Sequence, residues 1–166
     1  MSSEITVRRA TTHDVGAIRA LVDQYAGEVL LVKETVTLYE DVQEFWVAVD
    51  GDRILGCGAL HILWEDLGEI RTVAVDQAAK RRGVGGVIVD RLIQQGRDLG
   101  IERIFVLTFE TAFFASRGFR EIEGTPVTPE VYAEMRRSYD RGIAEFLDLE
   151  YVKPNTLGNT RMLLDL

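Results

Sequence analysis

The chain has few of the residues that mark several large protein classes. Its 166 residues include one cysteine, two histidines and three prolines. The single cysteine, Cys57, excludes an internal disulfide, and the histidines lack metal-site spacing, so we expect no bound metal. No segment reaches the roughly 20 apolar residues of a membrane span, and the N-terminus lacks the apolar stretch of a signal peptide. We therefore expect a cytoplasmic protein without membrane contact.

Positive charge is also scarce, because 19 lysine and arginine residues stand against 27 acidic ones and the formal net charge is −8. Such a chain lacks the basic face that nucleic-acid binding requires, so we expect no nucleic-acid partner. A hydrophobic content of 46% and a charged content of 28% are typical of a compact folded protein. The length suits a single domain over residues 1–166.

The apolar patterns predict an α/β fold. Residues 4–9 alternate as a strand, and a helix then places five apolar residues on one face: Val15, Ile18, Leu21, Val22 and Tyr25. Residues 27–41 are expected to form a loop and a short helix over a ligand. Segments 44–50 and 53–64, separated by Asp50-Gly51-Asp52, read as a hairpin. A further strand at 69–75 favours an antiparallel meander over repeated parallel units.

The second half of the chain alternates helices and short strands. We predict a helix at 83–100, a strand at 104–107, a short helix at 111–117 and a strand from 118. One long helix is predicted from 128 to about 148, followed by a strand at 161–164. The first of these helices is expected to bury Val84, Val87, Ile88, Leu92 and Leu99. The last helix carries a core or subunit-contact stripe of Val131, Met135, Tyr139, Ile143 and Phe146.

Residues 71–86 have the composition of a turn that binds pyrophosphate. A β-branched strand ends at Val75, the cations Lys80, Arg81 and Arg82 follow, and spaced glycines then open an apolar helix. Glycine lets the backbone approach a ligand closely, and the free N–H groups of a helix N-terminus attract phosphate oxygens. The alternative is an ordinary basic loop. A basic patch on an acidic chain favours a small phosphorylated ligand over a polyanion.

The order of elements over about residues 4–123 resembles the GNAT superfamily of N-acetyltransferases, with about 128–166 as a C-terminal helix and strand extension. Its signature of arginine or glutamine, two residues, glycine, one residue, and glycine or alanine falls on Lys80, Gly83 and Gly85, with lysine in first place. The resemblance implies a mixed, mostly antiparallel sheet flanked by helices, and acetyl-CoA as co-substrate. The implied cofactor-binding residues are Val73, Ala74, Val75, Lys80, Arg81, Arg82, Gly83, Val84, Gly85 and Gly86.

A narrower resemblance covers nearly the whole chain. The strings Gly56-Cys57-Gly58-Ala59-Leu60, Gly68-Glu69-Ile70-Arg71 and Arg117-Gly118-Phe119 are similar to the acetyltransferase part of bacterial N-acetylglutamate synthases. Thr37-Leu38-Tyr39-Glu40 and Tyr151-Val152-Lys153-Pro154-Asn155 are similar to the short actinobacterial form. The resemblance implies acetylation of the α-amine of L-glutamate in the first step of arginine biosynthesis. It also implies a homodimer. Arginine is a possible regulator, although no counterpart of the longer synthases' kinase-like domain is expected here.

Acetyl transfer to an amine needs a base, because an ammonium group has no lone pair. The resemblance implies that Glu69 is this base. Strand alternation places Glu69, Arg71 and Val73 on one face, and the alternative is that Glu69 and Arg71 form a surface ion pair. Thr108 falls where the synthases place a small hydroxyl residue, which would return a proton to the thiolate or orient the substrate. Phe114 stands where many family members have a tyrosine.

The two carboxylates of glutamate need cations or N–H donors in order to leave water. The candidate substrate-binding residues are Lys33, Arg71, Asn159 and Arg161. The alternative for Lys33 is a solvated loop lysine, and His61 is expected to be packed or at the surface. Because Cys57 is the only thiol, we expect direct attack without an acetyl-enzyme. Two other interpretations stay open: transfer to glutamine, another amino acid, a polyamine or a protein N-terminus, and a non-catalytic sensor of acyl-CoA or amino acids.

Overall fold

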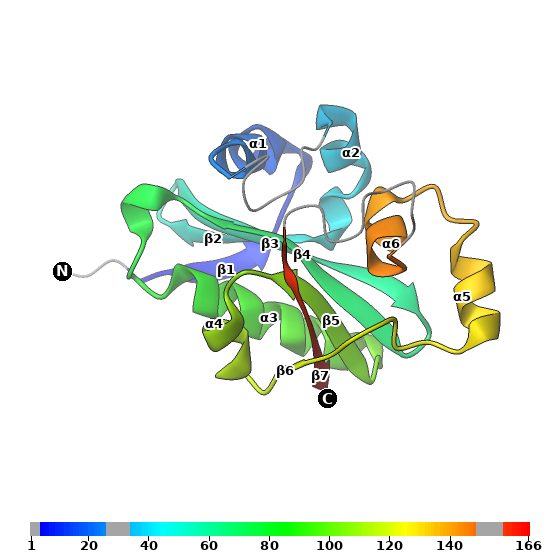
Figure 1. Ribbon diagram of the computed structural model, residues 1–166. Helices are drawn as coiled ribbons and strands as arrows, with labels where there is room; N and C mark the ends of the chain where they lie inside the picture. Colours follow the sequence, from blue (N-terminus) through cyan, green and yellow to red (C-terminus); the bar gives the residue numbers. More distant parts are fainter. Residues whose placement is uncertain (1–3, 26–33, 149–157) are drawn as a thin grey trace.

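The computed structural model describes residues 4–25, 34–148 and 158–166, which build a seven-stranded sheet in the order β1-β2-β3-β4-β5-β7-β6 (Figure 1). The strands are β1 (Thr6–Arg9), β2 (Phe45–Asp50), β3 (Arg53–Trp64), β4 (Leu67–Val75), β5 (Arg103–Thr108), β6 (Arg120–Glu121) and β7 (Thr160–Asp165). The helices are α1 (Val15–Asp23), α2 (Thr35–Glu40), α3 (Val84–Leu99), α4 (Thr111–Ala115), α5 (Pro129–Met135) and α6 (Arg141–Phe146). Single 3-10 turns are η1 (Thr12–Asp14), η2 (Val42–Glu44) and η3 (Gln77–Ala79).

The predicted meander is confirmed. Strands β2, β3 and β4 are successive antiparallel neighbours, and the β2–β3 hairpin closes at the pair Asp50 and Arg53. Strand β4 then pairs with β5 in parallel, and β7 inserts antiparallel between β5 and β6. The sheet is therefore mixed and mostly antiparallel, as expected for the α/β class.

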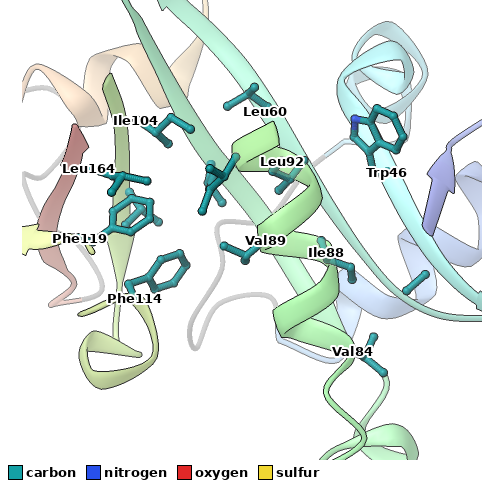
Figure 2. Packing of buried hydrophobic residues seen from close by; sticks show 14 of the residues in the cluster. Trp46, Leu60, Val84, Ile88, Val89, Leu92, Ile104, Phe114, Phe119 and Leu164 are labelled. Atoms are coloured by element: carbon teal, nitrogen blue, oxygen red, sulfur yellow. The ribbon is translucent and has the colours of Figure 1, made fainter. Parts of the chain in front are cut away.

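Helices cover both faces of the sheet. Helix α3 packs on one face, where it joins residues of β2, β3, β5, α4 and β7 in a large apolar cluster (Figure 2). On the opposite face α1 and α2 cover a second cluster with β2 and β3 residues, and α5 and α6 cover a third with β5 and β7 residues (Figure 1). The second and third clusters lie side by side on one face, because Ala59 and Leu63 point to the same side of β3.

The apolar stripe expected on α3 is partly wrong. Val84, Ile88 and Leu92 are fully buried, but Val87 is 39% exposed and Leu99 is 54% exposed. At 100° per residue, Val87 lies on the other side of Val84 from Ile88, and so falls outside the buried face. Leu99 is the last helical residue. The buried face is completed instead by Val89, Ile93 and Gly96.

The long helix predicted from 128 to about 148 is wrong, because the segment is broken into α5 and α6. Asp140 starts the second helix: its Oδ1 accepts a hydrogen bond from Ile143 N at 3.0 Å, and its own N donates to Ser138 Oγ at 3.1 Å. Short polar side chains compete for backbone groups in this way and favour caps over helix interiors. Tyr139 consequently lies in the connection and is fully exposed, while Met135 and Phe146 remain buried.

The short helix at the start of the chain and the length of the helices remain to be compared with the sequence predictions. The short helix expected within 27–41 is α2, while residues 26–33 of that segment lie outside the described residues. No helix of the described part of the chain is long and apolar enough to cross a membrane.

Candidate active site

Strands β4 and β5 separate at the middle of the sheet. Their parallel pairing ends at Ile70 and Val106, although β4 continues to Val75 and β5 to Thr108. On its other side β5 stays paired with β7 as far as Thr108 and Thr160. The wedge between the two diverging strands thus exposes one backbone edge of β4, which is available to a ligand.

A β-bulge in β4 accompanies this separation. The register with β3 runs from Ala59 opposite Arg71 to Cys57 opposite Ala74, so β4 holds one extra residue, and Thr72 has a positive φ of 57°. A bulge of this kind bends a strand and interrupts its alternation. The expectation that Val73 shares a face with Glu69 and Arg71 is therefore wrong. Val73 packs on the α3 side instead.

The end of β4 leads into the predicted phosphate turn. Asp76 caps η3 through a 2.9 Å hydrogen bond from Ala78 N, and Gly83, with φ of 78°, is the N-cap of α3. The first N–H groups of that helix have no intrahelical acceptor. A Cβ on Gly83 would have no neighbour within 4 Å, and one on Gly85 would first meet Val75 at 3.7 Å. The turn is therefore open in front of unpaired N–H donors, which fits a pyrophosphate group.

Two of the cations of the turn contact neighbouring side chains. Arg82 forms a 3.1 Å ion pair with Asp50. The Lys80 ammonium lies 5.6 Å from the centre of the Tyr25 ring, and the Tyr25 hydroxyl donates a 2.5 Å hydrogen bond to Val75 O. The structure therefore brings the turn, α1 and the end of β4 together. It also shows that one carbonyl of the β4 edge already has a partner.

A buried polar cluster lies on the opposite face of the sheet from α3, in the gap between the α1–α2 cluster and the α5–α6 cluster. Glu69 is 5% exposed, and its Oε2 lies 3.1 Å from Arg71 Nε without hydrogen-bond alignment. Arg71 Nη1 forms a 2.9 Å ion pair with Asp140 Oδ1. The predicted Glu69–Arg71 pair is thus present, but it is buried rather than at the surface.

Histidine 61 extends the cluster toward the surface. His61 lies opposite Glu69 in the β3–β4 pairing, and its Nδ1 is 2.7 Å from Glu44 Oε1. Burial raises the pKa of Glu69, and this effect outweighs the lowering by Arg71 and His61. For Asp140 burial also acts to raise the pKa, but Arg71 and His61 outweigh it and the pKa is lowered. Glu69 is therefore the more basic of these two carboxylates.

The remaining predicted residues lie beside the wedge, where β5 ends and β7 begins. Thr108 is buried, and its Oγ1 accepts a 2.8 Å hydrogen bond from Glu110 N. Asn159 is buried just before β7. Arg161 donates hydrogen bonds to Gly124 O at 2.9 Å and to Phe146 O at 2.5 Å, so it joins β7 to the end of α6. Lys33 lies outside the described residues.

Sequence reasoning missed two residues of the α6 segment. The predicted long helix places Asp140 in a helix interior, and no pattern in the sequence marks Gly142. A Cβ on Gly142 would overlap Arg71 Cζ and Nη2 and lie 2.9 Å from Nε, so the guanidinium packs directly on this glycine. The available signal was the run Ser138-Tyr139-Asp140, whose first and last residues favour helix starts.

Several buried polar atoms of this region have no hydrogen-bond partner within the described part of the chain. They are Glu69 Oε2, Arg71 Nε, Arg71 Nη2 and Asn159 Oδ1. Leaving a buried donor or acceptor unpaired costs about 1–3 kcal/mol each. The set contains both acceptors and donors, so it suits a ligand that carries a cationic donor and an anionic acceptor. Among the described residues no group of three or more histidine, cysteine or acidic side chains is arranged to hold a metal ion.

The chain belongs to the acetyltransferase (GNAT) family, whose sequence model matches residues 16–121. It is 68% identical over 161 residues to an amino-acid acetyltransferase of Mycobacterium tuberculosis, covering 95% of this chain and 92% of that protein. An amino-acid acetyltransferase of Salmonella arizonae is 29% identical over 140 residues, which are 82% of this chain but 30% of that relative. Family membership identifies an enzyme and sets aside the non-catalytic sensor.

Solved structures agree. A Mycobacterium tuberculosis protein in complex with CoA and a second ligand is 68% identical and superposes with a TM-score of 0.94, covering 97% of this chain and 99% of that chain. N-acetylglutamate synthase from Neisseria gonorrhoeae, complexed with coenzyme A and N-acetyl-glutamate, is 24% identical with a TM-score of 0.77. This chain covers 36% of that synthase, and the likeness shows the fold.

Proposed function

We propose that this acetyltransferase transfers the acetyl group of acetyl-CoA to the α-amine of L-glutamate, the first step of arginine biosynthesis. The family and the 68% identity to an amino-acid acetyltransferase support amino-acid N-acetylation with acetyl-CoA. The observation that carries the acceptor is the buried set of acceptor and donor atoms on Glu69, Arg71 and Asn159 that have no hydrogen-bond partner among the described residues. An amino acid presents an ammonium donor and a carboxylate acceptor, and so complements both.

The turn and the free edge of β4 would hold the acetyl donor. We assign the backbone at 73–75 to the pantetheine arm, because the wedge leaves this edge of β4 unpaired by β5. The N–H groups of Val84, Gly85 and Gly86 would bind the pyrophosphate, with Gly83 keeping the approach open. Lys80 and Arg81 would add charge. Arg82 would bind the pyrophosphate only after leaving its ion pair with Asp50.

Glu69 would act as the base. Its burial raises its pKa and so increases its affinity for the ammonium proton, and its Oε2, which lies 3.1 Å from Arg71 Nε without an aligned hydrogen bond, would accept that proton. The thioester supplies an activated acyl group, and the neutral amine would attack it directly. Burial raises the pKa of the Cys57 thiol to about 12, which disfavours a covalent acetyl-enzyme. Thr108 remains the candidate hydroxyl near the departing thiolate.

The substrate carboxylates would be bound by unequal partners. Arg71 Nε and Nη2 have no aligned hydrogen bond and would donate to a substrate carboxylate, whereas the unpaired Asn159 Oδ1 is an acceptor and would bind the substrate ammonium instead. Arg161 is already bonded to two backbone carbonyls, so we propose that it shapes the site more than it binds substrate. Lys33 stays a prediction for the side-chain carboxylate.

Glutamine is a second candidate acceptor. Arg71 lies between Glu69 and Asp140, and Arg161 is engaged by backbone carbonyls. Within the described residues, neither cation is therefore reserved for a second substrate carboxylate. A neutral carboxamide side chain needs no such cation, and its hydrogen bonds suit a polar acidic site.

The deciding experiment is thiol release from acetyl-CoA across a panel of glutamate, glutamine, other amino acids and a polyamine, with the product identified by mass. Release with glutamate and formation of N-acetylglutamate would support the proposal. Preference for glutamine by tenfold or more in kcat/KM would favour the second candidate. Thiol release from the best substrate, measured with and without added arginine, tests whether arginine regulates the enzyme. Release only with the polyamine would contradict an amino-acid acceptor.

We also propose that residues 1–166 form one N-acetyltransferase domain and that the protein is a cytoplasmic homodimer. Support for one domain comes from the single sheet that the described residues share. Light scattering at micromolar concentration should therefore give the mass of a dimer. A monomer at all concentrations would contradict the dimer.

A further inference from the structure

The Arg71 guanidinium is held from three sides. Its Nε lies 3.1 Å from Glu69 Oε2 on the same strand, and its Nη1 lies 2.9 Å from Asp140 Oδ1 at the start of α6. Gly142 closes the third side, because its Cα leaves no room for a Cβ against Cζ and Nη2. The Arg71 side chain is only 9% exposed. Its orientation therefore depends on α6 as much as on β4.

Asp140 does not depend on Arg71 for its own position. The same Oδ1 accepts the 3.0 Å hydrogen bond from Ile143 N that caps α6, and Asp140 N is bonded to Ser138 Oγ. A carboxylate fixed by a helix cap is a rigid anchor for a neighbouring cation. Asp140 thus holds one end of the guanidinium, while Glu69 has a poorly aligned contact with the other.

From this arrangement we propose that Asp140 and Gly142 are positioning residues for Arg71. They orient the guanidinium so that its positive charge is shared between Asp140 and Glu69, and Glu69 keeps its capacity to accept a proton. The proposal rests on the proposed role of Glu69 as the base. It assigns to α6 a function in tuning that base. Neither residue is assigned contact with the substrate.

The charges around Glu69 come from four elements. Arg71 on β4 and His61 on β3 favour its anionic form, His61 being paired in turn with Glu44 of η2. Arg161 on β7 also interacts with Glu69, whereas Asp140 opposes the anion. Removing the Asp140 charge would leave the whole Arg71 guanidinium to Glu69. A carboxylate with an undivided opposite charge beside it holds its proton less tightly.

The central test is the pH dependence of kcat/KM for the amino acid in Asp140→Asn. Asparagine keeps the helix cap and the size of the side chain but removes the charge. We expect the acidic limb to move to lower pH by ~0.5–1 unit, with an unchanged KM for acetyl-CoA. Asp140→Ser, which also caps but is too short to reach Arg71, should give the same shift. An acidic limb that stays in place in both folded variants overturns the proposal.

The role of Gly142 is tested by adding a methyl group that would collide with the Arg71 guanidinium. Gly142→Ala should push the guanidinium aside and lower kcat/KM at least tenfold. Gly16→Ala is the matched control, because Gly16 is also helical and a Cβ there would meet nothing within 4 Å. If Gly142 acts through Arg71, adding Gly142→Ala to Arg71→Lys should cost less than twofold. If the losses in kcat/KM of Gly142→Ala and Arg71→Lys are fully additive in the double variant, the proposed role of Gly142 is overturned.

Glu69→Gln separates this proposal from the proposed function. If Glu69 is the base, this variant loses the wild-type acidic limb and keeps only the rise with pH that follows the free amine of the substrate, and the Asp140 result then decides the present proposal. If Glu69→Gln retains the wild-type acidic limb, the base assignment itself fails and the tuning of Glu69 fails with it.

Discussion

Replacing Glu69 by glutamine tests the chemistry most directly. The substitution keeps the volume of a 5% exposed side chain but removes the only proton-accepting charge that we assign to the reaction. General-base catalysis contributes about 10²–10⁴ in rate, or roughly 2.7–5.4 kcal/mol of activation free energy. We therefore expect kcat to fall by this range at neutral pH.

The contacts around Glu69 indicate that the fall in kcat would not come from damage to the fold. Arg71 keeps its 2.9 Å ion pair with Asp140 when Glu69 is neutral, so the cation is not left unpaired. Burial of an amide costs less than burial of a carboxylate, and we expect a change in melting temperature of only a few degrees.

Two measurements on Glu69→Gln distinguish the loss of a base from damage to the site. Acetyl-CoA affinity by calorimetry should match that of the wild type, since Glu69 lies before the bulge and the turn follows it. Turnover should rise about tenfold per pH unit below the pKa of the substrate amine, because the free amine fraction then replaces the missing base. Wild-type turnover at neutral pH, or a lost rate that does not recover with pH, would refute the reasoning.

Three further outcomes are expected elsewhere in the chain. Gly83→Val should raise the KM for acetyl-CoA at least tenfold, because its side chain fills the open space in front of the α3 N–H groups, and it should also cost about 1–2 kcal/mol of stability, because a φ of 78° is strained for valine; an unchanged KM in the folded variant would remove the phosphate assignment. The Arg8 hydrogen bond, acting against burial, lowers the pKa of Asp14 to about 2, so the roughly 1–2 kcal/mol that this pair contributes is present above about pH 4 and is lost as the pH falls toward 2. Asp14→Asn should flatten that part of a pH–stability curve. Cys57, with its pKa raised to about 12 by burial, should react with a thiol reagent only after unfolding; fast native-state labelling would contradict this.

The turn and the meander could be predicted because their signals are local. Glycines 83 and 100 both adopt positive φ at the two ends of α3, as their positions in the pattern suggest. The hairpin residues Asp50 to Arg53 pair as expected. Each of these features depends on residues within a few positions of one another, so backbone chemistry alone is sufficient.

The acceptor site could be predicted only in part, because its residues meet through tertiary packing. Glu69 and Arg71 are two residues apart, and strand alternation offers a surface ion pair between them as the alternative to a base. The burial of that pair depends on α6, which begins as a separate helix at the Asp140 cap. A helical periodicity that continued through Tyr139 concealed this break, since spacing does not show which polar residue turns back to the backbone. Gly142 carried no local signal, as its importance lies entirely in the side chain packed against it.

The bulge at Thr72 joins the two halves of the site on a single strand. Before it, Glu69 and Arg71 face α6, and Ile70 faces α3. A regular strand would continue this alternation and place Val73 among the acceptor residues. The extra residue reverses the alternation, so Val73 packs on the α3 side, while the small Ala74 lies beside Cys57 on the other. Because the same distortion coincides with the end of β5 pairing, it opens the backbone edge for the acetyl donor directly beside the base. Insertion of one residue into β4 thereby sets both the orientation of the acceptor groups and the access of the donor, and shortening β4 by this residue would be expected to abolish turnover even if the sheet still formed.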